Sequence, residues 1–171
     1  MTIDELLPGD LLFVRDSSEF STAIIHSTSQ YSHVGIYFDR MIYHATRKLG
    51  VVRQDLLMYM NEGGREVFVY RYRDIDVDVA RQRAEFYIGR AYNDVFSTDD
   101  STLYCSQYIA RVLPIFDTVP MQFGDENNLV SEFWQQYFDE LGVSVPVNLE
   151  GTNPSQLSQS DKLHFIGQLE V

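Results

Sequence analysis

The sequence predicts an α+β fold. Apolar runs with strand-like alternation, such as "YSHVGIYF" and "MIYHAT", follow one another with only "DR" between them, a link that suits an antiparallel hairpin. Other runs, such as "LVSEFWQQYFDEL", carry apolar residues at helical spacing. Tyr and Phe, which favour sheets, number 11 each. Strands grouped together, with helices set apart from them, are typical of the α+β class.

Local signals position the individual elements. The turn "PGD" precedes the first strand, Ser17 or Ser18 can cap the first helix, and Pro114 ends the third. The expected elements, in order, are a strand at 11–14, a helix at 19–29, strands at 31–38, 41–46 and 49–54, a helical turn at 55–60, a strand at 67–72, and helices at 77–89, 103–113 and 129–141.

The length of 171 residues suits one domain, and 44% hydrophobic residues suffice for a core. We therefore expect a single domain over residues 1–171. The segment 143–171 is rich in Pro, Asn, Ser and Gln, which predicts an irregular C-terminal wrap over the core.

The net charge of −12 argues against nucleic acid as a partner, because most of the surface would repel phosphates. No apolar stretch approaches the roughly 20 residues that span a bilayer. The first residues, "MTIDELLPGD", lack the basic and apolar regions of a signal peptide. We expect a cytoplasmic protein, or a secreted or cell-envelope protein if a leader has been removed.

Cys105 is the one cysteine of the chain, so neither an intrachain disulfide nor a cysteine-based zinc cluster can form. It falls near the start of a predicted helix that Ser101 or Thr102 can cap. Unpaired N–H groups and the helix dipole favour a thiolate there, which predicts a lowered thiol pKa. The alternative is a small buried hydrophobic residue.

His33 and His44 are the second candidate pair. Strand alternation places His33, Gly35 and Tyr37 on one face, with a gap at the glycine. If Asp39 and its neighbour form the turn, residue 38 pairs with 41, and His44 lies within one or two pairs of His33. The second imidazole could then orient the first. The alternatives are a hydrogen-bonded core histidine and a solvent-facing edge histidine.

Other chemistry finds little support. His26 and His164 have no assigned role, and the histidine and cysteine spacings lack the short separations of common zinc sites. The serine-hydrolase elbow, the P-loop and the dinucleotide fingerprint are missing from the sequence. We expect neither a metal nor a cofactor.

The series "PGDLLFV", "STAIIHSTSQYSHVGIY", "IYHA", "GVV", "YNDVF" and "YCSQYI" resembles the circularly permuted papain-like hydrolases of the NlpC superfamily, most closely the YiiX-like branch. The resemblance runs from Pro8 to about Ile109. It implies a permuted papain-like fold, with an antiparallel sheet or partly open barrel against helices. Permutation accounts for the order, in which the histidine precedes the cysteine.

The resemblance also implies roles for the residues. Cys105 would be the nucleophile, His33 the general base and His44 the orienting group, where many YiiX-like members carry a glutamate. The lecithin:retinol acyltransferase-like group, also permuted, uses Cys-His-His. The Cys105 N–H would help to stabilise the oxyanion, with Tyr31 as a further donor, whereas Asp10 would hold a turn.

Three functions follow from this resemblance. The first is a cysteine amidase or peptidase that cleaves cell-wall-type peptides through a thioester. The second is a lipid acyl hydrolase or acyltransferase, and the third is a silent member that binds a peptide. The sequence leaves the oligomeric state open. An active enzyme predicts that Cys105 is hyper-reactive toward iodoacetamide near pH 6 and that His33→Ala removes this reactivity.

Overall fold

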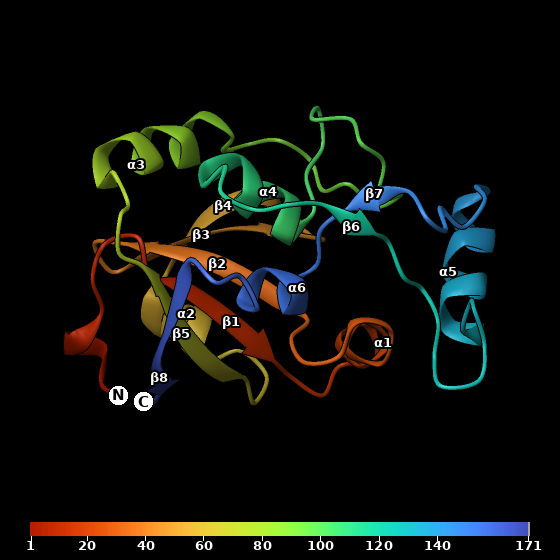
Figure 1. Cartoon of the computed structure of the whole chain (residues 1–171), viewed down its shortest axis with the longest axis horizontal. Helices are drawn as coiled ribbons and strands as arrows, with labels where there is room; N and C mark the ends of the chain where they lie inside the picture. Colours follow the sequence, from red (N-terminus) through yellow and green to blue (C-terminus); the bar gives the residue numbers. More distant parts are fainter. Residues whose placement is uncertain (171) are drawn as a thin grey trace.

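A six-stranded antiparallel sheet organises the computed structural model, which describes residues 1–170 (Figure 1). The strand order is β4-β3-β2-β1-β5-β8, and every neighbouring pair is antiparallel. The strands are β1 (Leu11–Arg15), β2 (His33–Phe38), β3 (Met41–Thr46), β4 (Gly50–Asp55), β5 (Glu66–Tyr72) and β8 (Leu163–Leu169). This confirms the predicted α+β class.

The predicted hairpin between β2 and β3 is present in the predicted register. Phe38 pairs with Met41 and Ile36 with Tyr43. Asp39 and Arg40 both have positive φ, 47° and 65°, as the two central residues of a type I′ turn require. Because two residues close this turn, the strand faces are determined, and the histidines of the two strands share one face.

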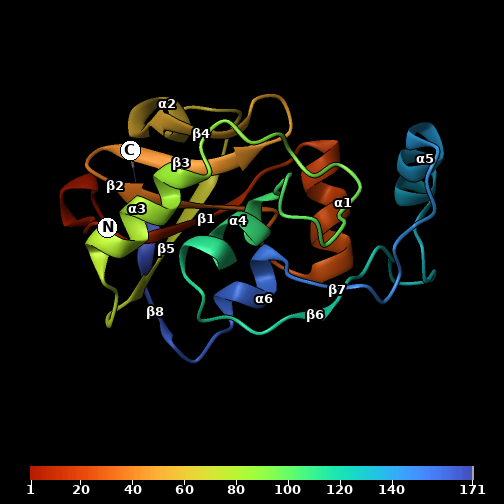
Figure 2. The ribbon, with the colours of Figure 1, turned by 90° about the horizontal axis from the view of Figure 1, so that it is seen from above.

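Helices cover both faces of the sheet (Figures 1 and 2). They are α1 (Glu19–Thr28), α2 (Leu56–Met60), α3 (Val77–Phe86), α4 (Cys105–Val112), α5 (Glu132–Leu141) and α6 (Pro154–Ser158), with a short 3-10 turn at Ile3–Glu5. A small second sheet pairs β6 (Val119–Pro120) with β7 (Glu150–Gly151).

The two faces of β2 and β3 pack into two different core clusters. Val34 and Ile36 pack with Cys105 and Ile109 of α4 on one face. Tyr37, Ile42 and the α2 residues Leu56 and Tyr59 pack together on the other. A third cluster, largely aromatic, joins α1 to α5 through side chains that include Phe96, Phe123, Trp134 and Phe138. The sheet therefore lies between α4 and α2.

The C-terminal segment departs from the prediction. An irregular wrap over 143–171 is wrong for residues 163–169, because β8 pairs with β5 as an edge strand of the main sheet. Its sequence, "LHFIGQL", contains a glycine and a histidine and alternates poorly. The pairing brings the ends of the chain together: the Met1 ammonium donates to the Gln168 carbonyl at 2.7 Å.

Asp10 holds a turn, as predicted. Its side chain is fully buried and accepts hydrogen bonds from the Leu7 N–H (2.8 Å) and from Arg71 Nε and Nη2 (2.6 and 2.8 Å). The ion pair between Asp10 and Arg71 links the turn before β1 to β5.

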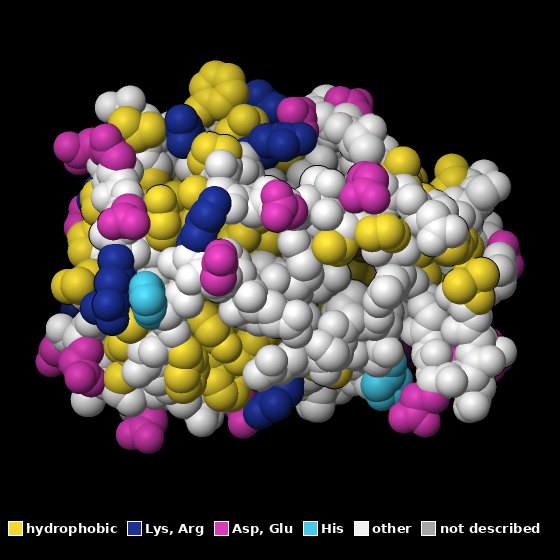
Figure 3. Space-filling model, viewed as in Figure 1, with side chains coloured by type: hydrophobic (Ala, Val, Ile, Leu, Met, Phe, Trp, Pro, Cys, Tyr) yellow, Lys and Arg dark blue, Asp and Glu magenta, His cyan; other side chains and the backbone are white. Residues whose placement is uncertain are grey.

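The described residues contain no helix with the length and apolar character needed to cross a membrane. On the face drawn in Figure 3, acidic side chains are scattered, and hydrophobic side chains gather over the edge formed by β5 and β8. The exposed ring of Phe165 belongs to this edge.

Candidate functional site

His33 and His44 are brought together by the β2–β3 hairpin. His33 Nε2 and His44 Nδ1 lie 2.8 Å apart, within hydrogen-bond distance, and the two rings are nearly perpendicular at 75°. Tyr59 of α2 packs against both rings, with centroids 6.3 Å from His33 and 5.1 Å from His44. The predicted proximity of the two histidines is confirmed.

Gly35 makes this approach possible. A Cβ built on Gly35 would lie 2.6 Å from Ile42 Cγ2 and 3.3 Å from the His44 Cβ. Side chains of β3 therefore occupy the predicted gap beside His33. The glycine admits the orienting histidine to the site.

Both imidazoles are held in the neutral state. Burial lowers the pKa of His33 well below its usual value, and the positive charges of a protonated His44 and of Arg65 act in the same direction. Burial likewise lowers the pKa of His44 to about 4, with Arg65 contributing. A neutral imidazole keeps one lone pair, which is what a general base requires.

Cys105 is the first residue of α4, whereas the prediction began the helix at residue 103 and placed the cysteine near its start. The N-cap is Tyr104, whose N–H donates to Gln107 Oε1 at 3.1 Å, so the predicted caps Ser101 and Thr102 are wrong. The loop before the helix stays extended up to Tyr104, because Leu103 pairs through its N–H with the Ala91 carbonyl.

The predicted lowering of the thiol pKa is wrong. Cys105 is buried, and burial raises the pKa of its thiol to about 11. The backbone N–H groups of Val34, Ser106 and Cys105 itself face the sulfur and offset only part of this effect. The helix start contributes the expected N–H groups, but loss of solvent outweighs them. We therefore no longer expect iodoacetamide hyper-reactivity near pH 6.

The Val34 N–H belongs to the peptide group that follows His33, so the sulfur lies beside the start of β2. Within residues 1–170, no hydrogen bond joins the Cys105 sulfur to either imidazole. The structure thus pairs the two histidines directly and places the cysteine next to β2, the strand that carries His33.

Two neighbouring cavities are lined by the cysteine and by the histidines. The first, of about 50 Å³, is lined by Cys105 and Ser106 together with mainly apolar side chains, among them Met121, Phe123 and Trp134. Figure 3 shows a hollow near β6 and β7, from which several of its lining residues come. The second, of about 550 Å³, is lined by His33 and His44.

Tyr92 and Ser32 line both cavities, so these two residues lie between the cysteine cavity and the histidine cavity. Burial raises the pKa of Tyr92 well above its usual value, which keeps its hydroxyl protonated. Sequence reasoning assigned no role to Tyr92, although it opens the "YNDVF" segment on which the family resemblance rests. No local pattern in the long loop that contains Tyr92 indicated that this residue would line both cavities.

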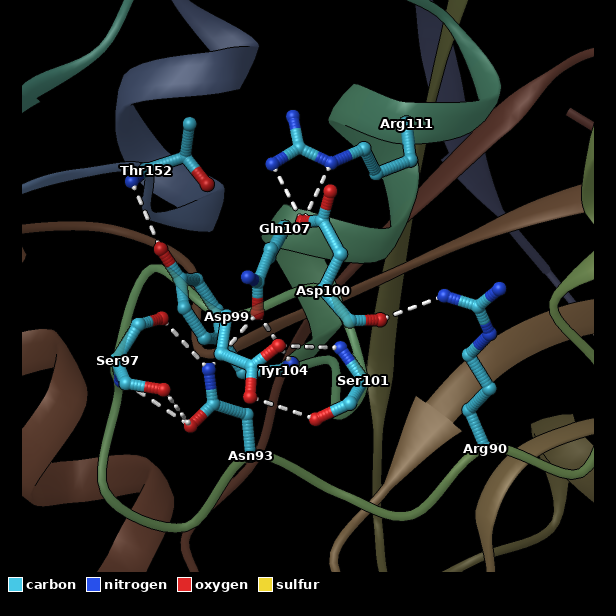
Figure 4. Close-up of polar contacts among 10 residues, drawn as sticks. All are labelled: Arg90, Asn93, Ser97, Asp99, Asp100, Ser101, Tyr104, Gln107, Arg111 and Thr152. Carbon is cyan, nitrogen blue, oxygen red and sulfur yellow. Dashed lines mark hydrogen bonds and ion pairs between the residues drawn. The ribbon is translucent and has the colours of Figure 1, made fainter.

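A polar network secures the start of α4 (Figure 4). The Asn93 side-chain amide donates to Gln107 Oε1 (3.1 Å) and to the Ser97 carbonyl (2.8 Å). The Tyr104 hydroxyl accepts from the Thr152 N–H, and Thr152 Oγ1 donates to Ser106 Oγ at 3.0 Å. These contacts join the loop before α4 to the segment between β7 and α6, and they hold the N–H groups that face the sulfur.

Tyr31 is not brought to the site. Its ring is buried among Phe13, Phe68 and Tyr70. Its hydroxyl lies 3.2 Å from the Tyr70 hydroxyl and accepts a hydrogen bond from the Gln30 side chain at 3.0 Å. Tyr31 lines neither cavity. The suggested role as an oxyanion donor therefore has no geometric support.

Known proteins share this architecture. The crystal structure of the metalloprotein yiiX from Escherichia coli O157:H7 superposes with a TM-score of 0.79 and 23% sequence identity, over 94% of this chain and 96% of that one. Among curated proteins, none matches the sequence. Residues 5–167 match the family described as permuted papain-like amidase enzyme, YaeF/YiiX, C92 family. The chain belongs to this family of permuted papain-like amidases.

Proposed function

We propose that the protein is a cysteine amidase or peptidase that cleaves its substrate through a thioester on Cys105. The observation that carries the proposal is the 2.8 Å pair of neutral histidines beside a cysteine at a helix start. The family supplies the amidase class. Cell-wall-type peptides remain the substrate class that we propose from the family resemblance.

The proposed mechanism begins with a neutral thiol and a neutral imidazole. If His33 Nε2–H donates to His44 Nδ1, then His33 Nδ1 keeps its lone pair and can take the Cys105 proton as the sulfur attacks the carbonyl. The backbone N–H groups at the start of α4 stabilise the oxyanion. The protonated His33 then gives its proton to the leaving amine, and water hydrolyses the thioester.

His44 acts as the positioning residue in this scheme. Its Nδ1 accepts the hydrogen bond from His33 Nε2–H that fixes the tautomer. Its own Nε2 is buried, and a side-chain hydrogen bond with Gln54 acts on the pKa of His44 against the effect of burial.

The size of the first cavity favours a small acyl group over a lipid chain. Its volume of about 50 Å³ is a third of the roughly 150 Å³ that holds a benzene molecule. A fatty-acyl chain does not fit this space, whereas a short aliphatic side chain does. Because the lining is apolar, a lipid acyl hydrolase is the second candidate function, and a lipid substrate would require the cavity to widen.

The described residues offer no set of ligands for a metal-dependent mechanism. The related yiiX is described as a metalloprotein. Within residues 1–170 of this chain, no group of three His, Cys, Asp or Glu side chains is arranged to hold a metal ion. The facing nitrogens of His33 and His44 are hydrogen-bonded to each other, which leaves no room for a zinc ion at about 2.0–2.1 Å from each.

The test uses 4-nitrophenyl acetate, an activated ester with a small acyl group. We expect a burst of 4-nitrophenolate and, after acid quenching, a protein mass increased by one acetyl group, located on the Cys105 peptide. Cys105→Ala should abolish the burst, and His33→Asn should slow acylation by about 10²–10⁴-fold. Hydrolysis that persists in Cys105→Ala would contradict the proposal, and a wild-type protein with neither a burst nor an acetyl group on Cys105 would favour the silent, peptide-binding alternative.

A further inference from the structure

We propose that Arg47 is a specificity-determining residue that binds a carboxylate on the leaving-group side of the scissile bond. The inference rests on the proposed function and adds the chemical character of the substrate: an amide whose amine portion carries an anionic group.

The two cavities divide the substrate between them. In acyl transfer the acyl group stays on the sulfur, while the leaving amine must receive its proton from the imidazolium. Cys105 lines the small apolar cavity, and His33 and His44 line the large one. The leaving portion therefore occupies the large cavity, whose volume of about 550 Å³ lies within the usual range of ligand pockets.

This large cavity is cationic in an otherwise acidic protein. Four of its lining residues are basic, Arg47, Lys48, Arg53 and Arg65, and two are acidic, Asp16 and Glu62. The difference, four minus two, is +2, against −12 for the whole chain. Because surface charge elsewhere repels anions, the cavity is where an anionic group would be attracted.

Arg65 is already engaged. Its Nη2 pairs with Glu62 at 2.7 Å, and its Nη1 donates to the Tyr59 carbonyl at 3.1 Å. These contacts assign Arg65 to the support of α2 and of the loop that follows it.

Arg47 is held in place without an acidic partner. Its guanidinium carbon lies 4.0 Å from the centre of the Phe20 ring and 5.4 Å from that of Tyr137. The ion pairs found in residues 1–170 involve other arginines. The guanidinium also donates a hydrogen bond to the Tyr137 side chain, and its remaining edge N–H donors can bind a carboxylate in the planar geometry that arginine provides.

The cavity also carries apolar contacts for the rest of the leaving portion. Leu49 and Met58 line it, and their exposed fractions are 66% and 65%. Exposed side chains of this kind beside a guanidinium suit an amine portion that combines a carboxylate with an apolar group, such as the C-terminal residue of a peptide.

The experiment compares two esters that differ only in the leaving group, 4-nitrophenyl acetate and 3-carboxy-4-nitrophenyl acetate. For each, kcat/KM is divided by the spontaneous hydrolysis rate. We expect the wild-type protein to prefer the carboxylated ester by about tenfold or more, the size of one charge-assisted hydrogen bond, and the preference to fall with added salt.

In Arg47→Gln this ratio should fall about tenfold, and Arg47→Lys should retain part of it because the charge remains. Arg83→Gln, an exposed arginine of α3, should keep the wild-type ratio. A wild-type ratio near one, with the acetyl group still forming on Cys105, would overturn the role of Arg47 and leave the proposed function intact.

Two further outcomes are decisive. If Arg53→Gln lost the preference and Arg47→Gln kept it, the assignment to Arg47 would be wrong. If neither ester acetylated Cys105, the proposed function itself would fail, and the inference with it.

Discussion

At the scale of single residues, the site depends on which atoms of His44 face His33. Nδ1 is the His44 atom that lies within hydrogen-bond distance of the His33 ring. The side-chain oxygen of asparagine can occupy the place of this nitrogen, whereas leucine fills the volume without an acceptor.

We therefore predict that His44→Asn retains most of the acylation rate, while His44→Leu loses about 10² of it, because the His33 tautomer is no longer fixed. Stopped-flow measurement of the 4-nitrophenolate burst checks this, with circular dichroism to confirm folding. Equal losses in the two variants would show that His44 does not act through its hydrogen bond.

The pH dependence of acylation follows from the same residues. His33 loses its lone pair on protonation, and its pKa lies well below the usual value. We predict that kcat/KM for 4-nitrophenyl acetate stays level as the pH falls through about 6.5, where an ordinary histidine would titrate. Alkylation by iodoacetamide should rise toward pH 11 instead of reaching a plateau near pH 6. A plateau near pH 6 would instead show that Cys105 is already a thiolate there, which contradicts a mechanism that starts from a neutral thiol.

At the scale of elements, the loop that carries Tyr92 is tied to the first residues of β4. The Val51 N–H donates to the Arg90 carbonyl, and the Gly89 N–H donates to the Val51 carbonyl, both at 2.9 Å. Gly50 makes this contact possible. Its φ is +72°, and a Cβ there would lie 2.2 Å from the Arg90 carbonyl oxygen.

Gly50→Ala should therefore lower the free energy of unfolding by more than the roughly 1–2 kcal/mol of left-handed strain alone, and it should also slow acylation by displacing the loop. Gly63→Ala is the matched control, because Gly63 has φ +58° and no atom within 4 Å of its Cβ position. Equal effects in urea denaturation would mean that the contact with Arg90 is unimportant.

At the scale of the whole molecule, the buried pair of Asp10 and Arg71 joins the N-terminal turn to β5. Asp10→Asn leaves the arginine without its charge partner, so the free energy of unfolding should fall by about 3 kcal/mol. Glu66→Gln, which removes the partner of Arg15 in an exposed pair, should have a much smaller effect. Chemical denaturation of both variants distinguishes the two cases.

Acid should destabilise the molecule through its buried histidines. The pKa of His44 is about 4 in the folded state and about 6.5 when unfolded, so the unfolded chain binds the proton more tightly. The contribution of His44 to the free energy of unfolding is fully present above about pH 6.5. It is lost as the pH falls toward 4, and the loss is on the order of 3 kcal/mol. His44→Asn should flatten this part of the curve, measured by urea denaturation against pH.

Much of the fold followed from local patterns. The two-residue link after Phe38 set the hairpin register, which placed His33 beside His44, and helical spacing located α4 with Cys105 at its start. The strand β8 was missed because its alternation is weak and its pairing partner, β5, lies far away in the sequence.

The sequence by itself determined the α+β class, the hairpin that pairs the histidines and a helix with the cysteine near its start, because turns and periodicity act over a few residues. Only the tertiary structure decided the protonation states, since burial raises the pKa of Cys105 and lowers those of both histidines. It also decided that Tyr92 lines both cavities and that Arg47 stacks on Phe20. Solvent exclusion and contacts between distant segments exist only once the whole chain has packed.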